Sequence, residues 1–167
     1  DSATSGKYIL NDQDVSHMED NALADVRNRE IGFVFQQFNL LPRLTALENV
    51  ALPLVYAGLA RKARTERARK VIEMVGLTDR SHHKPNELSG GEQQRVAVAR
   101  ALINKPDVIF ADEPSGNLDT HSAENLHQLF FQLRDEFGQT FVIVTHNEEL
   151  ANMADRKLVM SDGQIIS

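Results

Sequence analysis

Short runs of apolar, β-branched and aromatic residues recur along the chain and predict β-strands. The five runs are residues 8–10, 31–35, 108–111, 141–144 and 157–160. The third and fourth runs are apolar at every position, which is typical of strands buried on both faces of a parallel sheet. Turn-forming pairs follow two of the runs: Asn11-Asp12 ends the first, and Asp162-Gly163 predicts a hairpin to residues 164–166.

Apolar residues at helical spacing fill the intervals between these runs. They predict helices at residues 45–58 (with a kink at Pro53), 60–75, 91–104, 120–136 and 147–154. The side chains expected to face inward are Ala63, Val71, Met74 and Val75 in the second helix and Leu126, Leu129, Phe130, Leu133 and Phe137 in the fourth. The alternation predicts an α/β fold with a parallel sheet and right-handed crossovers. Residues 1–43 and 105–167 would form the core, and residues 44–104 an inserted helical lobe.

Composition narrows the class of protein. Apolar residues make up 41% of the 167 residues and charged residues 25%, which is ordinary for one globular domain with a real core. The net charge of −6 gives no basic surface for nucleic acid, and the basic run in 60–75 is expected to be a solvated face. The absence of cysteine excludes disulfides and thiolate metal sites. No apolar run is long enough to cross a bilayer, so we expect a soluble protein that would serve a membrane only through a partner.

The first residues imitate the end of a phosphate-binding loop, G-x-x-x-x-G-K-[ST]. Gly6-Lys7 fits the pattern, but Asp1 stands where the first glycine belongs and Tyr8 where the hydroxyl belongs. A predicted strand follows instead of a helix, so we interpret Ser5-Gly6-Lys7 as a turn. No other segment of the sequence matches the pattern.

Two acidic residues end the apolar run in VIFADEP. In an open α/β sheet, ligands bind beyond the carboxyl ends of the strands. Asp112 could hold Mg²⁺ there, directly or through water, and Glu113 could polarise an attacking water. Taken alone, the pair could equally cap the next element.

The string LSGGEQQR places a serine and two glycines at the start of a helix. Gly90 and Gly91 would let a phosphate approach free backbone amides at the positive end of the helix dipole. Ser89 adds a hydroxyl donor. Ser89 and Glu92 also form a capping-box pattern, and both interpretations can hold, because a rigid helix start is a better anion site.

LSGGEQQR resembles the signature motif of ABC-type ATPases, and four further strings occur in that family's order. They are FVFQQ with Gln36 at the Q-loop position, VIFADEP as the Walker B strand with the catalytic glutamate, SGNLD (115–119) as the D-loop, and VTHN (144–147) as the switch histidine. The resemblance covers essentially the whole chain and implies a P-loop NTPase-like core. FNLLPRLTALENVALPL and YAGLARKAR are similar to the lipoprotein-releasing and macrolide-efflux group.

The resemblance implies a mechanism in which two subunits enclose two ATP molecules head to tail. The P-loop of one subunit and the signature of the other would contact each ATP. Glu113 would position the water, His146 would contact the γ-phosphate, and Gln36 and Asp112 would bind Mg²⁺. The residues implied to contact nucleotide are Gln36, Ser89, Gly90, Gly91, Glu92 and Asp119, the last at the subunit boundary. Alone, His146 would be a turn residue, Gln36 a strand end and Asp119 a helix cap; their joint order argues otherwise.

The chain departs from the family in having no P-loop. We therefore expect a fragment that begins just after the P-loop helix and is inactive alone, and we expect the missing strand beside the strand of Asp112. The implied partners are a membrane-spanning transporter subunit or domain and a second ATPase subunit, with no nucleic acid. The implied location is cytoplasmic, on the inner face of the plasma membrane.

Two other functions stay open. The first is a non-transport ABC ATPase that acts on DNA or ribosomes, against which stand the acidic charge and the short lobe between Gln36 and Leu88. The second is a non-catalytic module that keeps only the signature face. A P-loop encoded upstream would exclude the second, and a neighbouring gene for a membrane protein would favour the transporter.

Overall fold

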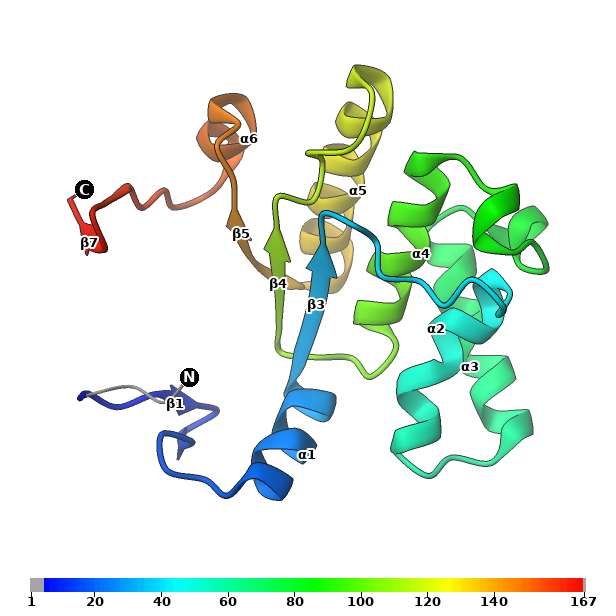
Figure 1. The fold of residues 1–167 in the computed structure, drawn as a ribbon, viewed down its shortest axis with the longest axis horizontal. Coiled ribbons are helices and arrows are strands. Elements are labelled where there is room, and N and C mark those ends of the chain that lie inside the picture. Colours follow the sequence, from blue (N-terminus) through cyan, green and yellow to red (C-terminus); the bar gives the residue numbers. More distant parts are fainter. Residues whose placement is uncertain (1–4, 167) are drawn as a thin grey trace.

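The computed structural model describes residues 5–166 and confirms the α/β class. Residues 1–4 and 167 lie outside this range, among them Asp1 of the imitated loop. Three parallel strands form the central sheet in the order β3 (Ile31–Phe35), β4 (Val108–Asp112) and β5 (Thr140–Val144) (Figure 1). The register pairs Ile31 with Val108 and Val108 with Thr140, so the three strands start level and end level.

Two helices cover one face of this sheet. α4 (Gly90–Leu102) packs on β3, and α5 (Thr120–Phe137) packs on both α4 and β5. The residues buried on this side include Val34, Ile109, Ala111, Val98, Leu126 and Leu133. At Gly32 the contact is especially close, because an added Cβ would lie 2.8 Å from the Ala101 carbonyl oxygen.

α2 (Ala46–Tyr56) and α3 (Arg61–Met74) pack against each other and against α4 (Figure 1). Thr45 and Glu48 form a capping box at the start of α2, and Pro53 lies in its last turn, three residues before Tyr56. Two short 3₁₀ turns, Thr78–Arg80 and Pro85–Glu87, lead to α4. These helices lie between β3 and β4 in the chain, while the proposed division of the chain at residues 44 and 104 stays a prediction.

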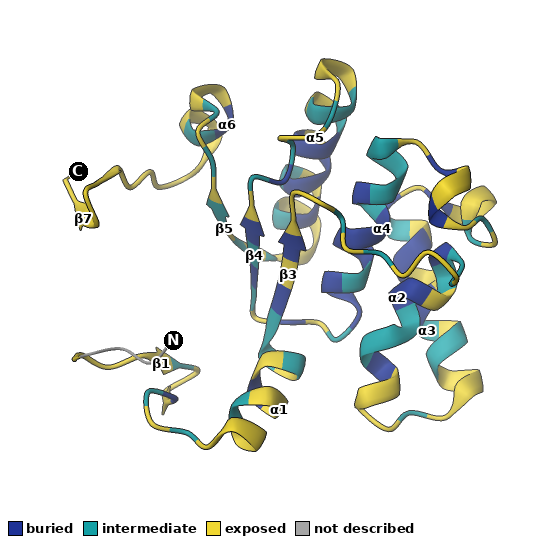
Figure 2. Cartoon of the chain, in the orientation of Figure 1, coloured by how far each residue is buried: buried dark blue, intermediate teal, exposed yellow. Residues whose placement is uncertain are grey.

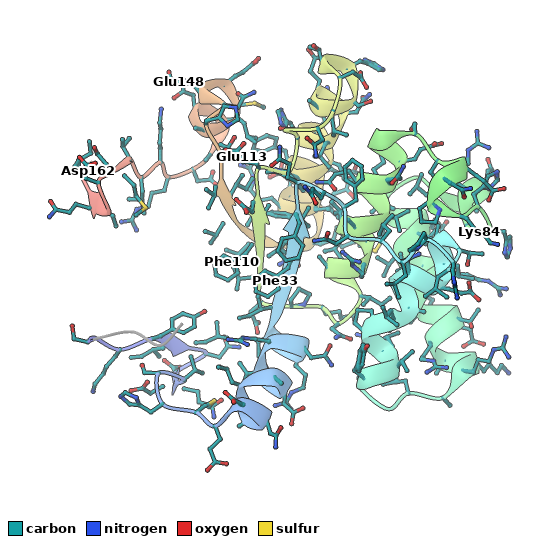
Figure 3. All side chains as sticks on the ribbon, viewed as in Figure 1. Phe33, Lys84, Phe110, Glu113, Glu148 and Asp162 are labelled. Atoms are coloured by element: carbon teal, nitrogen blue, oxygen red, sulfur yellow. The ribbon has the colours of Figure 1, made fainter. Side chains whose placement is uncertain are left out.

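The expectation that the strands are buried on both faces is wrong. Side chains of β5 alternate between exposed and half-buried positions, and Val142 and Val144 are 43% and 61% exposed. Phe33 and Phe110 lie on the same open face, with ring centroids 5.9 Å apart (Figure 3). The physical reason is that no helix of residues 5–166 packs on this face, so its apolar side chains contact mainly one another (Figure 2).

Two hairpins lie apart from the sheet (Figure 1). β1 (Ile9–Leu10) pairs with β2 (Gln13–Asp14), and Asn11 and Asp12 between them have φ of 49° and 60°. β6 (Met160–Ser161) pairs with β7 (Gln164–Ile165) across the predicted Asp162-Gly163 turn. Both turns are therefore confirmed, and their two left-handed residues suit a tight antiparallel hairpin.

The strand expected at 157–160 is wrong in extent, and it does not join the parallel sheet. Within 157–160 only Met160 is a strand residue, and its described strand partner is Ile165 of the predicted hairpin. Leu158 is 50% exposed, because no described strand of the parallel sheet lies beside this segment. A short helix, α6 (Glu148–Met153), separates it from β5.

Three narrower expectations also need correction. Ala63 is exposed, whereas Ala68 and Ile72 are the buried residues of α3, together with Val71. Phe137 is 55% exposed, because it is the last residue of α5 and extends beyond the packed region. β4 has partners on both sides, so no further strand fits beside the strand of Asp112.

The helix α1 (Asp20–Glu30) was not predicted from the sequence. Only Val26 of this helix is buried, so it lacks a clear apolar face. It leads directly into β3. Among the described residues, no helix has the length and apolar content needed to span a membrane.

Candidate functional site

Four of the predicted site residues meet at the carboxyl edge of the sheet. The register aligns the last residues of β3, β4 and β5, and Asp112 is the last residue of β4. Gln36 and Glu113 follow β3 and β4 directly, and His146 follows β5 after one intervening residue, Thr145. The level strand ends therefore place these polar side chains where α/β proteins bind ligands.

Glu113 is held in an unusual backbone conformation. Its amide continues the sheet by donating to the Val144 carbonyl oxygen at 2.9 Å, but its φ is +42°, a left-handed value that is uncommon outside glycine. Glu113 Oε1 accepts a hydrogen bond from the His146 amide at 2.8 Å and lies 2.8 Å from His146 Nδ1. Oε2 accepts from Thr145 Oγ1 at 3.3 Å. The left-handed turn thus places Glu113, predicted to polarise the water, in contact with His146, the predicted switch histidine.

Gln36 is anchored to the D-loop. Its Nε2 donates to Asn117 Oδ1 at 3.2 Å, and Asn117 Nδ2 donates back to the Gln36 carbonyl oxygen at 3.0 Å. Gly116 lies directly against the side chain, where an added Cβ would be 2.7 Å from Gln36 Nε2. With its nitrogen engaged by Asn117, Gln36 has its side-chain oxygen left for another ligand.

Asp112 extends from the open face of the sheet and is exposed. No side-chain hydrogen bond to it occurs in the described part of the chain. Residues 5–166 contain no cluster of three or more His, Cys, Asp or Glu side chains that could hold a metal alone. One free carboxylate and one amide oxygen nevertheless suit Mg²⁺, which keeps several waters and takes its other ligands from substrate phosphates.

The signature residues form the capping box that their pattern predicts. Ser89 Oγ accepts from the Glu92 amide at 3.3 Å, and the Ser89 amide donates to Glu92 Oε2 at 2.8 Å. Arg80 forms an ion pair with Glu92 at 3.0 Å. The hydrogen bond from the Ser89 backbone, with a smaller effect of Arg80, lowers the pKa of the Glu92 carboxyl. The first turn of α4 is therefore rigid.

The two signature glycines also have a packing role. An added Cβ on Gly91 would lie 3.0 Å from Ser122 Oγ in α5, whereas one on Gly90 would meet nothing closer than Leu118 at 3.5 Å. Within residues 5–166, no hydrogen bond or ion pair joins the signature residues to Glu113 or His146. The structure thus groups the predicted residues into two sets, one at the sheet edge and one at the start of α4.

Asp119 caps α5, as its alternative interpretation stated. Its Oδ1 accepts from the Ser122 amide at 3.0 Å, and the hydrogen bonds of Ser122 lower the pKa of the Asp119 carboxyl. This cap does not test the predicted place of Asp119 at a subunit boundary. At the other end of the D-loop, Ser115 Oγ lies 3.1 Å from Nε2 of the buried His127.

A protein-family model described as "ABC transporter" matches residues 1–116. The chain belongs to the ABC transporter family. It is 59% identical over 165 residues to the lipoprotein-releasing system ATP-binding protein LolD of Bacteroides thetaiotaomicron, covering 99% of this chain and 76% of that protein. It is 49% identical over 167 residues to the macrolide export ATP-binding/permease protein MacB of Vibrio parahaemolyticus, covering 25% of that protein.

Solved structures agree with this ABC transporter assignment. A dimeric post-hydrolysis state of the ATP-binding cassette MJ0796, bound to ADP and Pi, has a TM-score of 0.85 and 43% identity to this chain. The similarity covers 99% of this chain and 73% of that one. The predicted family and the P-loop NTPase-like fold class are therefore confirmed, together with the ATPase class of its relatives.

Sequence reasoning missed three residues of this ABC transporter site. Asn117 lies inside the quoted D-loop string, and Gln94 inside the signature string, but neither received a role. Arg100 donates to the Asn39 carbonyl oxygen at 2.5 Å and to the Phe38 carbonyl oxygen at 2.9 Å. In the sequence, these residues could be noticed only as amide or guanidinium side chains inside or near a recognised motif. Their hydrogen-bond partners lie far away in the chain, so no local pattern predicts them.

Proposed function

We propose that these residues work in the ATP-hydrolysing subunit of an ABC transporter, which powers a membrane partner that extracts lipoproteins or exports amphipathic compounds. The observation that carries the proposal is the contact of Glu113 with His146 at the sheet edge, beside Asp112 and Gln36. The relatives named LolD and MacB support the cargo class.

In this proposal Glu113 orients the attacking water. Its carboxylate accepts a hydrogen bond from the water and favours in-line attack on the γ-phosphate, which is mainly a task of positioning and charge stabilisation. An ionised carboxylate only accepts, so the proton between Glu113 and His146 lies on Nδ1. With Nδ1 of His146 engaged by Glu113, Nε2 is the ring nitrogen left to contact a phosphate oxygen.

Asp112 and Gln36 are the residues that would hold Mg²⁺. When bound, the ion supplies positive charge to the phosphate oxygens as negative charge develops on them. Asn117 donates a hydrogen bond to the Gln36 carbonyl oxygen and so links Gln36 to the D-loop. Binding of the ion by Gln36 would therefore also affect the position of the D-loop.

Ser89, Gly90, Gly91 and Glu92 act on the ATP of a second subunit. Support comes from their separation from Glu113 and His146 and from the free amides in the first turn of α4. The head-to-tail pair would place Asp119 at the boundary, and the dimeric structures of the MJ0796 cassette are in accord with a pair. The location follows from the membrane partner: peripheral, on the inner face of the membrane.

The test uses a P-loop fusion, in which a segment carrying G-x-x-x-x-G-K-[ST] precedes Asp1. Glu113→Gln keeps the shape of the side chain but removes the charge that orients water. We expect hydrolysis to fall at least 100-fold, and we expect ATP to hold the variant as a dimer in size-exclusion chromatography. Glu148→Gln, an exposed change on α6, is the matched control and should hydrolyse normally without accumulating the dimer. A Glu113→Gln protein that stays monomeric at saturating ATP contradicts the assigned role.

The 167-residue chain without the added segment should release no phosphate from Mg-ATP. Its sequence contains no loop whose amides and lysine could hold the β- and γ-phosphates. Turnover by the chain that disappears in Glu113→Ala would show that nucleotide is held in another way.

A further inference from the structure

Gln94 is a fully buried polar side chain that joins three functional segments. It lies on α4, five residues after Ser89, and is 0% exposed. Its Nε2 donates to the Pro114 carbonyl oxygen at 2.5 Å and to the Phe35 carbonyl oxygen at 3.2 Å. Pro114 directly follows Glu113, and Phe35 directly precedes Gln36. One amide group therefore connects the signature helix to the backbone beside both residues.

The amide is not explained by packing alone. Gln94 Oε1 is buried and has no hydrogen-bond partner within residues 5–166. A half-satisfied buried amide costs stability, whereas an apolar side chain of similar length could fill the same space without an unpaired oxygen. What an apolar side chain could not supply is the pair of donated hydrogen bonds.

The adjacent Gln93 shows that position on the helix does not dictate such bonds. Gln93 Nε2 donates to the Leu88 carbonyl oxygen at 3.1 Å, within its own segment. Farther along the same helix, Arg100 donates to the Phe38 carbonyl oxygen at 2.9 Å. α4 therefore contacts the backbone on both sides of Gln36, and only Gln94 among these three also contacts the loop of Glu113.

We infer that Gln94 is a positioning residue that couples the signature helix to the catalytic edge of the same subunit. The inference rests on the proposed function, in which Ser89 contacts one ATP while Gln36 and Glu113 serve the other. A helix is stiff over one turn, so a displacement of Ser89 moves the Gln94 amide and both carbonyl groups that it holds. The two ATP sites of a dimer are thereby linked through each subunit, and this link is a free energy that can be lost while each site still binds.

The first test needs no activity and uses the 167-residue chain. Gln94→Met keeps the length of the side chain and removes both donors, and Gln93→Met is the matched control. Hydrogen exchange of the amides in residues 36–39 and 113–118 should be at least tenfold faster in Gln94→Met and within twofold of the parent in Gln93→Met. Unchanged exchange at both loops in a folded Gln94→Met protein overturns the inference.

The second test uses the P-loop fusion. Gln94→Met should lower kcat at least tenfold, leave KM for ATP within threefold, and reduce any cooperativity in ATP toward a Hill coefficient of 1; Gln93→Met should change none of these. A merely structural role would lower only the melting temperature and the folded fraction. If the unchanged fusion is inactive, the proposed function fails; if it is active and folded Gln94→Met equals it, this inference fails.

A third measurement covers the case in which Gln94→Met does not fold. In the parent chain, the side-chain amide protons of Gln94 should exchange at least tenfold more slowly than those of the exposed Gln164 in NMR spectra. Equal exchange of the two amides overturns the inference without any variant.

Discussion

His127 is a buried histidine behind the D-loop. Its ring is hydrogen-bonded to Ser115, and burial lowers its pKa, against a smaller opposing effect of Glu149 and Glu124. A histidine whose pKa is lower in the folded state binds a proton more readily when unfolded. Its contribution to stability is complete above the unfolded pKa, near 6.5, and is lost as the pH falls through the folded value.

We therefore expect the melting temperature of the chain to fall between pH 7 and pH 5, and His127→Gln to reduce that fall. Glutamine can still bond to Ser115 but does not titrate. His121→Gln, on the exposed first turn of the same helix, is the control and should keep the parent's pH dependence. Thermal unfolding followed by circular dichroism at several pH values measures this, and identical slopes for the parent and His127→Gln would contradict it.

At the scale of single residues, the sequence predicted those site residues that a short local pattern can identify. Asp112 and Glu113 end an apolar run, and Ser89 with Glu92 shows the spacing of a capping box, so a short string was sufficient. The partners of Gln94 lie 59 and 20 residues away, at Phe35 and Pro114, and no local pattern announces them. The left-handed backbone of Glu113 was equally hidden, because glutamate has no preference for that conformation.

At the scale of elements, the position of α4 depends on close backbone contact. Gly32 in β3 permits this, since an added Cβ would lie 2.8 Å from a backbone oxygen of Ala101 that cannot rotate away. The helices and the three parallel strands followed from periodicity. Periodicity did not predict which faces of the sheet are covered by helices. An apolar run such as 141–144 has the same sequence pattern whether helices pack on one face or on both.

Gly32→Ala should destabilise the chain by about 1–3 kcal/mol, the usual cost of overpacking. For a domain of this size that corresponds to a melting temperature lower by about 2–4 °C per kcal/mol. Gly90→Ala is the matched control: its added Cβ would make only ordinary contacts, the nearest at 3.5 Å, so its melting temperature should stay close to the parent's. Equal melting temperatures for Gly32→Ala and the parent would show that β3 and α4 separate easily.

At the scale of the whole molecule, the loop after Gln36 is an apolar surface on a rigid support. Asn49 is fully buried; its Oδ1 accepts from the Leu41 amide at 2.8 Å, and its Nδ2 donates to the Leu41 and Leu44 carbonyl oxygens at 3.2 Å each. Leu40 and Leu47 pack against the core, whereas Leu41 is 45% exposed. The loop therefore presents Leu41 outward at a fixed place, between Gln36 and the helices of 44–104.

We propose that Leu41 belongs to the surface that receives the membrane partner, where an apolar helix face would dock. Leu41→Ser should leave the basal ATPase of the P-loop fusion within twofold of the parent and weaken its stimulation by the membrane subunit at least fivefold in proteoliposomes. Val55→Ser is the matched control, because Val55 is 46% exposed on α2 and lies outside the loop. Leu40→Ser should instead lower the melting temperature, because it removes a side chain packed against the core.

Coupling between two sites can be lost while each site still works. A docking residue is therefore identified by a variant with normal melting temperature and normal basal activity but lost stimulation. Full stimulation and transport by a folded Leu41→Ser protein would place the docking surface elsewhere.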